Sequence, residues 1–389
     1  MIQRPYIGAM RFNQTGAISA ALGGLFAMAT AIGIGRFVYT PILPPMIEAL
    51  GLSKSQAGLI ASANFLGYLI GALLAAIPIL PGSRRAWLLG SLAASALTTA
   101  AMGLSEALPA FLVLRFIGGA ASAFVLIFAA TMVLERLAEV RRGGLSALHF
   151  AGVGSGIVVS AALVAAMLGM GQSWQALWLA SGALSVAGTL AVAVLVPSRA
   201  PAPLPAGSQA RAALDPSLRR LVIAYGLFGF GYIITATFLV AIVRGAPEIR
   251  ALEPVIWIVF GAAAAPSVAL WSRVAASLGI PRAFALAAII EAAGVLASVA
   301  WPTTSGVVLA AVLVGGTFMG LTALGLIRAR ALATGDPRRA LALMTGAFGL
   351  GQIVGPAFAG IVSDRLGGFT LPSLVAAAAL LIAAALARD

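Results

Sequence analysis

The chain has 389 residues, of which 61% are hydrophobic and 9% are charged, with a formal net charge of +13. Soluble proteins average about 45–50% apolar and about 25% charged residues, so this composition excludes a sizeable soluble domain. The basic residues stand as short arginine pairs between apolar runs, which argues for a role in membrane orientation and not for nucleic-acid binding. The chain has no cysteine, which excludes disulfides, thiolate metal sites and cysteine nucleophiles.

Apolar runs long enough to cross a bilayer follow one another along the whole chain. In the first half they cover about residues 17–46, 55–79, 85–104, 108–135, 143–169 and 173–196. In the second half they cover about residues 219–243, 253–274, 281–301, 305–327, 339–363 and 369–387. The runs predict an all-α polytopic membrane protein with twelve transmembrane helices. The first run continues past the ~7–15-residue core of a signal peptide, so we interpret it as an uncleaved span.

A stretch rich in proline, alanine and glycine separates the two sets of six runs. Its sequence, PSRAPAPLPAGSQARAALDP, begins at Pro197 and is not apolar enough to span a membrane. We therefore predict an N-terminal six-helix bundle at 1–196, a cytoplasmic linker at 197–217 and a C-terminal six-helix bundle at 218–389.

The basic residues divide unequally between the two sides of the membrane. If the N-terminus is cytoplasmic, eighteen lie on that side and four on the other, and two, Arg36 and Arg115, lie inside spans. Cytoplasmic loops of membrane proteins carry an excess of Lys and Arg, so both termini are predicted to be cytoplasmic. The expected location is a cell membrane, a bacterial inner membrane in particular, with the lipid bilayer as a partner and the chain as a monomer.

Three glycine landmarks recur at a constant offset of about half the chain. They are Gly33-Ile-Gly35 and Gly229-Phe-Gly231 (offset 196), Gly118-Gly119 and Gly315-Gly316 (offset 197), and Gly152-Val-Gly154 and Gly349-Leu-Gly351 (offset 197). Six spans restore the direction of the chain, so the repeat relates helices of the same orientation. A parallel duplication of this kind predicts two pseudo-symmetric bundles.

Several stretches resemble the major facilitator superfamily. Arg115-Phe-Ile-Gly-Gly119 in the fourth span is similar to its intramembrane Arg-x-x-x-Gly motif, and Gly355-Pro356 through Asp364-Arg365 is similar to its eleventh helix. Gly33-Ile-Gly-Arg-Phe-Val-Tyr-Thr-Pro41, Ala63-Asn-Phe-Leu-Gly-Tyr-Leu-Ile-Gly71 and His149-Phe-Ala-Gly-Val-Gly154 resemble the YbfB/YjiJ-type branch. The resemblance covers all twelve spans and implies a transporter with a central site between the bundles.

The chain departs from that superfamily in the loop between the second and third spans. The loop keeps a glycine and paired arginines, but alanines stand at Ala75 and Ala76, where the usual aspartate is expected. This departure puts the charge-relay latch of that loop in doubt.

Polar side chains inside the spans are the candidate site, because an unpaired charge there costs about 2.5–3.5 kcal/mol or more. Arg36 is predicted to coordinate an anion, with Tyr39 nearby, because a guanidinium offers a fixed fork to a carboxylate or phosphate. Arg115 is a second candidate for substrate binding or coupling, with helix packing as the equal alternative. Asn64 and Tyr68 lie four residues apart on one face of the second span.

The second half contributes neutral groups. Tyr232 occupies the repeat position of Arg36, Gln352 lies near that of Ser155, and Trp257 falls early in the eighth span. These residues predict an asymmetric site, cationic on one side and hydrogen-bonding and aromatic on the other.

Two titratable residues complete the candidates. His149 is the only histidine, and imidazole exchanges protons near neutrality, so it is a candidate for substrate binding or proton coupling. Glu291 is the one acid clearly inside a span, and its alternatives are a structural role and a proton-coupling role. Arg115 is the third proton-coupling candidate.

These features predict a secondary active transporter and no enzyme, because phosphate loops, nucleophile–base arrangements and acidic metal clusters are missing from the sequence. No cofactor, catalytic residue, metal site or nucleic-acid partner is expected. The expected substrate is a small organic anion or zwitterion, such as a carboxylate, moved by alternating access and coupled to protons. The alternative is a proton-coupled exporter of diverse hydrophobic compounds. A scaffold or sensor without turnover also remains open.

Overall fold

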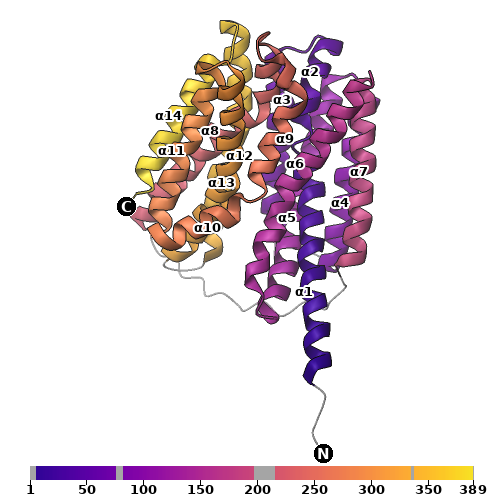
Figure 1. Cartoon of the computed structure of the whole chain (residues 1–389), viewed down its shortest axis with the longest axis vertical. Helices are drawn as coiled ribbons and strands as arrows, with labels where there is room; N and C mark the ends of the chain where they lie inside the picture. The colour runs from indigo at the N-terminus through magenta and orange to yellow at the C-terminus, as the bar shows by residue number, and fades with distance from the viewer. Residues whose placement is uncertain (1–5, 76–81, 197–214, 334–336, 389) are drawn as a thin grey trace, which may run out of the picture.

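The computed structural model describes residues 6–75, 82–196, 215–333 and 337–388, and these residues contain helices and no strand. Most of the predicted linker lies outside the described residues, so the boundaries of the two bundles stay a prediction. Figure 1 shows the helices running roughly side by side, with the first half of the chain next to the second.

The first half contains seven α-helices and three short segments of other helical types. They are α1 (Tyr6–Met28), the π-helix η1 (Ala29–Ile34), α2 (Tyr39–Leu50), α3 (Lys54–Ala75), α4 (Arg84–Ala101), η2 (Met102–Leu104), α5 (Leu108–Glu139), η3 (Gly143–Leu145), α6 (Ser146–Gly169) and α7 (Trp174–Leu195). Because α1, η1 and α2 follow one another in one continuous apolar stretch, they form a single interrupted span.

The second half repeats this order. Its helices are α8 (Pro216–Arg244), η4 (Arg250–Leu252), α9 (Glu253–Ala264), α10 (Ser267–Leu278), α11 (Ile280–Ala300), α12 (Thr304–Leu332), α13 (Pro337–Leu366) and α14 (Thr370–Leu386). Among the described residues, ten helices are long and apolar enough to cross a membrane. The pair α9 and α10, bent by 42°, adds the eleventh span, and the 17-residue α14 adds the twelfth. The predicted twelve-helix architecture is confirmed.

Helix boundaries follow local chemistry. Ser83 and Ser173 precede α4 and α7, and their hydroxyls accept a hydrogen bond from a backbone N–H of the first turn. Asp215 does the same for α8. Such caps satisfy backbone donors that have no partner inside the helix. Gly51 ends α2 with φ of 63°, a left-handed conformation that glycine adopts without a steric penalty.

The two halves contact each other at positions related by the repeat. Thr40 Oγ1 donates to Ala236 O at 2.8 Å, and Arg244 Nη2 donates to Glu48 Oε2 at 2.6 Å. Within each pair the two residues are 196 positions apart in the sequence, which equals the offset of the first repeat landmark. Around a two-fold axis, residues close to the axis meet their own equivalents. The structure therefore confirms the duplication and places α2 and α8 beside the pseudo-two-fold axis.

Two further helix pairs join the halves, α3 with α13 and α6 with α9, and these pairs are themselves equivalent by the repeat. In Figure 1 the ribbons of the halves run close together at the end away from the N-terminus and diverge toward the end where α1 begins. We call the first end the closed end and the second the N-terminal end.

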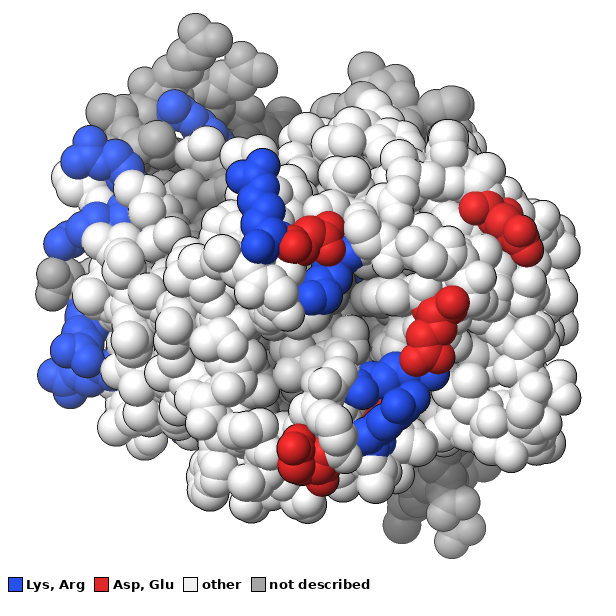
Figure 2. All heavy atoms as spheres, turned by 90° about the horizontal axis from the view of Figure 1, so that it is seen from above, with Lys and Arg blue, Asp and Glu red and all other residues white. Residues whose placement is uncertain are grey.

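Hydrogen bonds and ion pairs fasten the closed end. Asp364 of α13 accepts from the backbone N–H groups of Lys54 at 3.0 Å and Ser55 at 2.8 Å, which begin α3. Arg244 pairs with Glu48 of the first half and with Glu253 at 3.1 Å. Figure 2, which looks onto this end, shows blue and red side chains touching in a mostly white surface. The aspartate expected in the loop after α3 is missing from the sequence, whereas Asp364 caps the N-terminus of the same helix.

Candidate substrate-binding site at the break in the first span

The first span is interrupted where Gly33, Gly35 and Pro41 occur. Gly35 N donates to Thr30 O at 2.9 Å and Phe37 N to Ile32 O at 3.2 Å, both five residues back, and a regular α-helix resumes at Tyr39. Glycine lowers helix propensity, and proline removes a backbone donor. The Cα of Gly33 faces the backbone of Gly156 in α6, where any side chain would clash. Glycine at position 33 thus allows the first span to approach α6 closely.

Arg115 holds the carbonyl groups that this break leaves free. Its Nη1 donates to Gly35 O at 2.8 Å and its Nη2 to Arg36 O at 2.9 Å. Asn64 of α3 in turn donates through Nδ2 to Arg115 O at 2.9 Å. Of the two interpretations of Arg115, these contacts match helix packing: the guanidinium joins α5 to the interrupted span.

Two aromatic residues support the same segment. Pro41 cannot donate to the carbonyl of Phe37, and Trp257 Nε1 of α9 donates to that carbonyl at 3.2 Å. Tyr39 donates its hydroxyl to Ala57 O of α3 at 2.8 Å, and its ring lies 5.2 Å from Arg115 Cζ. Both predicted site residues are buried and bind backbone in this structure.

Arg36 has a different environment. Its side chain is 6% exposed, and its Cζ lies 4.1 Å from the centroid of the Tyr68 ring and 5.0 Å from that of Phe65. Its Nε and Nη2 are buried and have no hydrogen-bond partner, and it forms no ion pair with a described carboxylate. Aromatic faces attract a cation but do not replace hydrogen bonds. The guanidinium is therefore a buried cation that lacks an anion.

The second half faces this cation with a stack of aromatic rings. Tyr232 is parallel to Phe318 and Phe348, with ring centroids 5.5 Å and 5.9 Å away, and lies close enough to Arg36 to interact electrostatically. Gln352 Nε2 donates to the Tyr232 hydroxyl at 2.5 Å, and Gln352 Oε1 is buried without a partner. We call Arg36, Phe65, Tyr68, Tyr232 and Gln352 the Arg36 cluster.

His149 lies outside the Arg36 cluster. It is fully buried one turn into α6, where its Nδ1 faces the backbone of Gly24 in α1 and its ring meets Phe150 edge-on at 4.8 Å. Gly24 precedes Arg36 by twelve residues, which corresponds to about 18 Å along a helix. The histidine therefore sits at a helix contact and not beside the cation.

Glu291 lies near the aromatic stack that contains Tyr232. It is fully buried in α11, and its Oε1 accepts from Thr317 Oγ1 at 3.1 Å. The next residue in α12, Phe318, stacks on Tyr232. Its Oε2 has no partner among the described residues.

Three aromatic residues in or around the Arg36 cluster, Phe65, Phe318 and Phe348, were not predicted from the sequence. Phe65 was passed over because one more phenylalanine among apolar residues carries no periodic signal, although it stands between Asn64 and Tyr68. Phe318 stands two residues after the Gly315-Gly316 landmark, and this proximity is the signal that could have identified it.

Two solved structures of transporters have a fold similar to that of this chain. A mutant of the nucleoside transporter NupG aligns with a TM-score of 0.71 and 14% identity over 94% of this chain and 98% of that chain. A bacterial homologue of the human lysosomal transporter Spinster, inward-facing and unoccupied, aligns with a TM-score of 0.69 and 15% identity over 96% of both chains. At these identities the likeness shows the fold alone.

The family follows from the sequence match. The model of the family described as uncharacterised MFS-type transporter YbfB matches residues 28–388, and no curated protein matches the chain. The chain belongs to this family of major facilitator transporters. It is a multi-pass membrane protein and a transporter, not an enzyme, which confirms the resemblance found in the sequence.

Proposed function

We propose that the protein is a secondary active transporter of a small organic anion or zwitterion, such as a carboxylate, and that Arg36 binds the negative group. The observation that carries the proposal is the buried Arg36 guanidinium, whose Nε and Nη2 have no partner. An uncompensated charge inside a membrane protein is costly and typical of a substrate pathway. Thermal stabilisation of the purified protein by small carboxylates, and its loss in Arg36→Ala, tests the proposal.

The neutral side of the cluster suggests a second contact for the substrate. Gln352 Oε1 can accept a hydrogen bond, and the hydroxyl hydrogen of Tyr232 remains available because its oxygen accepts from Gln352. A substrate with a carboxylate and a neighbouring donor satisfies both halves at once. Since these atoms are buried, the substrate reaches them only when the bundles move apart.

Alternating access requires the closed end to open. Replacing Asp364 with alanine removes acceptors for the Lys54 and Ser55 N–H groups and leaves the ion pairs of Arg244 in place. A lost hydrogen bond to a charged group costs at least about 1 kcal/mol, which corresponds to about a fivefold change in an equilibrium constant. Thr40 is buried between the halves, so the thiol of a Thr40→Cys reporter is reached from the closed end only when that end opens, and we expect Asp364→Ala to raise its labelling rate about fivefold.

The native chain has no cysteine, so the reporter needs no further substitution. Glu106→Ala is the matched control, because Glu106 is exposed before α5 and makes no contact between the halves in this structure. Equal labelling of Thr40→Cys in both backgrounds would show that Asp364 does not hold this end closed.

We propose proton coupling through Glu291. One oxygen of this carboxylate has no partner, and the residue is linked to Tyr232 through Thr317 and Phe318. Glu291→Gln keeps the size of the side chain and an acceptor for Thr317. We expect it to abolish uphill transport driven by a pH gradient while counterflow between equal pH values continues.

His149→Gln is the comparison for this experiment, because His149 packs between α6 and α1 away from the cluster. We expect gradient-driven transport in His149→Gln to stay within about twofold of the native protein. Loss of coupling in His149→Gln with retention in Glu291→Gln would reverse the assignment.

The orientation also remains a proposal, with both termini cytoplasmic in a bacterial inner membrane. It is supported by the eighteen basic residues that the topology assigns to the side of the termini, against four on the other. Reporter fusions at each terminus test it: activity of a periplasm-dependent reporter at either end would contradict it.

The alternative function is proton-coupled export of diverse hydrophobic compounds. The observation that favours it is the aromatic stack of the second half, in which Trp257, Phe260 and Phe318 continue the rings around Tyr232. Stabilisation by hydrophobic cations that persists in Arg36→Ala would support this function and exclude anion transport.

A further inference from the structure

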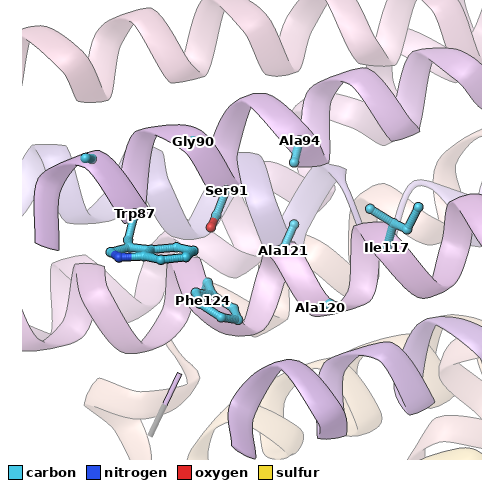
Figure 3. Close-up of a pocket in the computed structure, with 9 residues that line it drawn as sticks. Trp87, Gly90, Ser91, Ala94, Ile117, Ala120, Ala121 and Phe124 are labelled. Atoms are coloured by element: carbon cyan, nitrogen blue, oxygen red, sulfur yellow. The ribbon is translucent and has the colours of Figure 1, made fainter. Parts of the chain in front are cut away.

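A hollow between α4 and α5 lies outside the proposed transport site. Its volume is 510 Å³, within the ~300–1,000 Å³ of small-molecule sites. Figure 3 shows the side chains of Trp87 and Phe124 at one end and those of Ala94 and Ile117 at the other. The hollow exists because glycine and alanine occupy the middle: a Cβ on Gly90 would meet no atom within 4 Å.

The hollow faces the lipid side of the spans. Ile117 in its wall is 43% exposed, and on the same two helices Leu97 is 68% and Val113 57% exposed. Exposed apolar side chains at this density are expected where a membrane protein meets acyl chains. The lining is apolar apart from the Ser91 hydroxyl and the Trp87 indole nitrogen, so it suits a hydrocarbon chain.

One end of the hollow carries charge. Arg84 stands one turn before Trp87 in α4, and Glu135 stands three turns after Phe124 in α5, so both continue the helix faces that line the hollow. Arg84 Nη1 bonds to both Glu135 oxygens, at 3.1 Å and 3.0 Å. A guanidinium has five donors, and this ion pair uses Nη1 alone.

The surroundings of Arg84 combine the Glu135 carboxylate with two features that attract an anion. It begins α4, where the helix dipole attracts negative charge, and its neighbour Arg85 bonds to Val196 O at 2.8 Å. A ligand with a hydrocarbon chain and a phosphate fits this site, because the chain suits the apolar lining and the phosphate can bind Arg84. We propose that the hollow between α4 and α5 binds one acyl chain of a membrane phospholipid whose phosphate is held by Arg84.

Occupancy of the hollow would act on the transport site through α5. Ile117 lies two residues from Arg115, whose guanidinium holds the carbonyls of Gly35 and Arg36. An acyl chain that fills the space between α4 and α5 packs against α5, the helix that carries Arg115. We therefore expect the bound lipid to stabilise the protein.

The test compares the full-length protein in detergent with two leucine variants. Gly90→Leu fills the hollow, whereas Ala93→Leu adds the same bulk to an exposed position of α4 that does not line it. Dioleoyl-phosphatidylglycerol is the probe, and dioleoylglycerol, which has the same chains and no phosphate, is its control. The measurements are the unfolding temperature and the lipid retained in native mass spectrometry.

We expect phosphatidylglycerol to raise the unfolding temperature of the native protein and of Ala93→Leu by several degrees, with one lipid retained. In Gly90→Leu both effects are expected to disappear. In Arg84→Gln, a substitution at a half-buried position that keeps a hydrogen-bond donor for Glu135, the advantage of phosphatidylglycerol over dioleoylglycerol is expected to vanish. Equal stabilisation of Gly90→Leu and Ala93→Leu, or equal stabilisation of the native protein by both lipids, would overturn the proposal.

Discussion

Arg36→Ala is expected to remove the binding of small carboxylates and to stabilise the empty protein. Truncating one partner of a buried charge pair costs about 2 kcal/mol or more, so affinity should fall at least about 30-fold. In the empty state the same substitution removes a buried cation whose Nε and Nη2 have no partner, and such a charge is costly. Unfolding temperatures with and without ligand measure both effects.

Two variants separate the charge from its geometry. Arg36→Lys keeps the charge but not the planar fork, so we expect weak, residual binding of carboxylates. Arg282→Ala removes an exposed arginine at the start of α11 and should leave binding unchanged. An Arg36→Ala protein that retains carboxylate binding, or that is less stable when empty, would mean that Arg36 serves the structure instead.

Arg115→Ala is expected to have the opposite effect on stability. It would leave Gly35 O and Arg36 O unsatisfied in the core, where a lost hydrogen bond to a charged donor costs about 1.5–3 kcal/mol. We expect the free energy of unfolding to fall by about 3 kcal/mol or more, with a lower unfolding temperature in the absence of any ligand. Transport should fall with it, because the backbone that carries Arg36 loses its support.

Arg115→Lys gives the matched comparison, since an ammonium group cannot present the same planar pair of donors. We expect it to lie between the native protein and Arg115→Ala in stability. If Arg115→Ala unfolds at the native temperature but cannot transport, Arg115 would be a substrate or coupling residue and not a support of the break.

The number of helices and the duplication were predictable because they rest on long-range regularities. Apolar runs identify spans, and a constant offset survives even where side chains differ. The structure added that Thr40 with Ala236 and Glu48 with Arg244 meet across the pseudo-axis. The π-helical segment was not predicted, because glycines and a proline in a span indicate a weak point without specifying how the backbone rearranges.

The site was only partly predictable, because the sequence identifies unusual residues but does not specify their contacts. Arg36 stands out in any reading, since an arginine inside a span is rare. Arg115 looked equivalent to it in the sequence, because both are buried arginines at similar depth. Only coordinates distinguish a guanidinium that binds two backbone carbonyls from one whose Nε and Nη2 bind nothing. The sequence likewise left two roles open for Glu291, and the structure adds that its partner Thr317 precedes Phe318, which stacks on Tyr232.

The central claim is that Arg36 binds the substrate's negative group, and a structure solved with a stabilising carboxylate tests it most directly. We predict ligand density between Arg36 and Tyr232, with carboxylate oxygens within hydrogen-bond distance of the guanidinium Nε and Nη2. Density for the ligand elsewhere in the molecule, with Nε and Nη2 of Arg36 still unpaired, would contradict it.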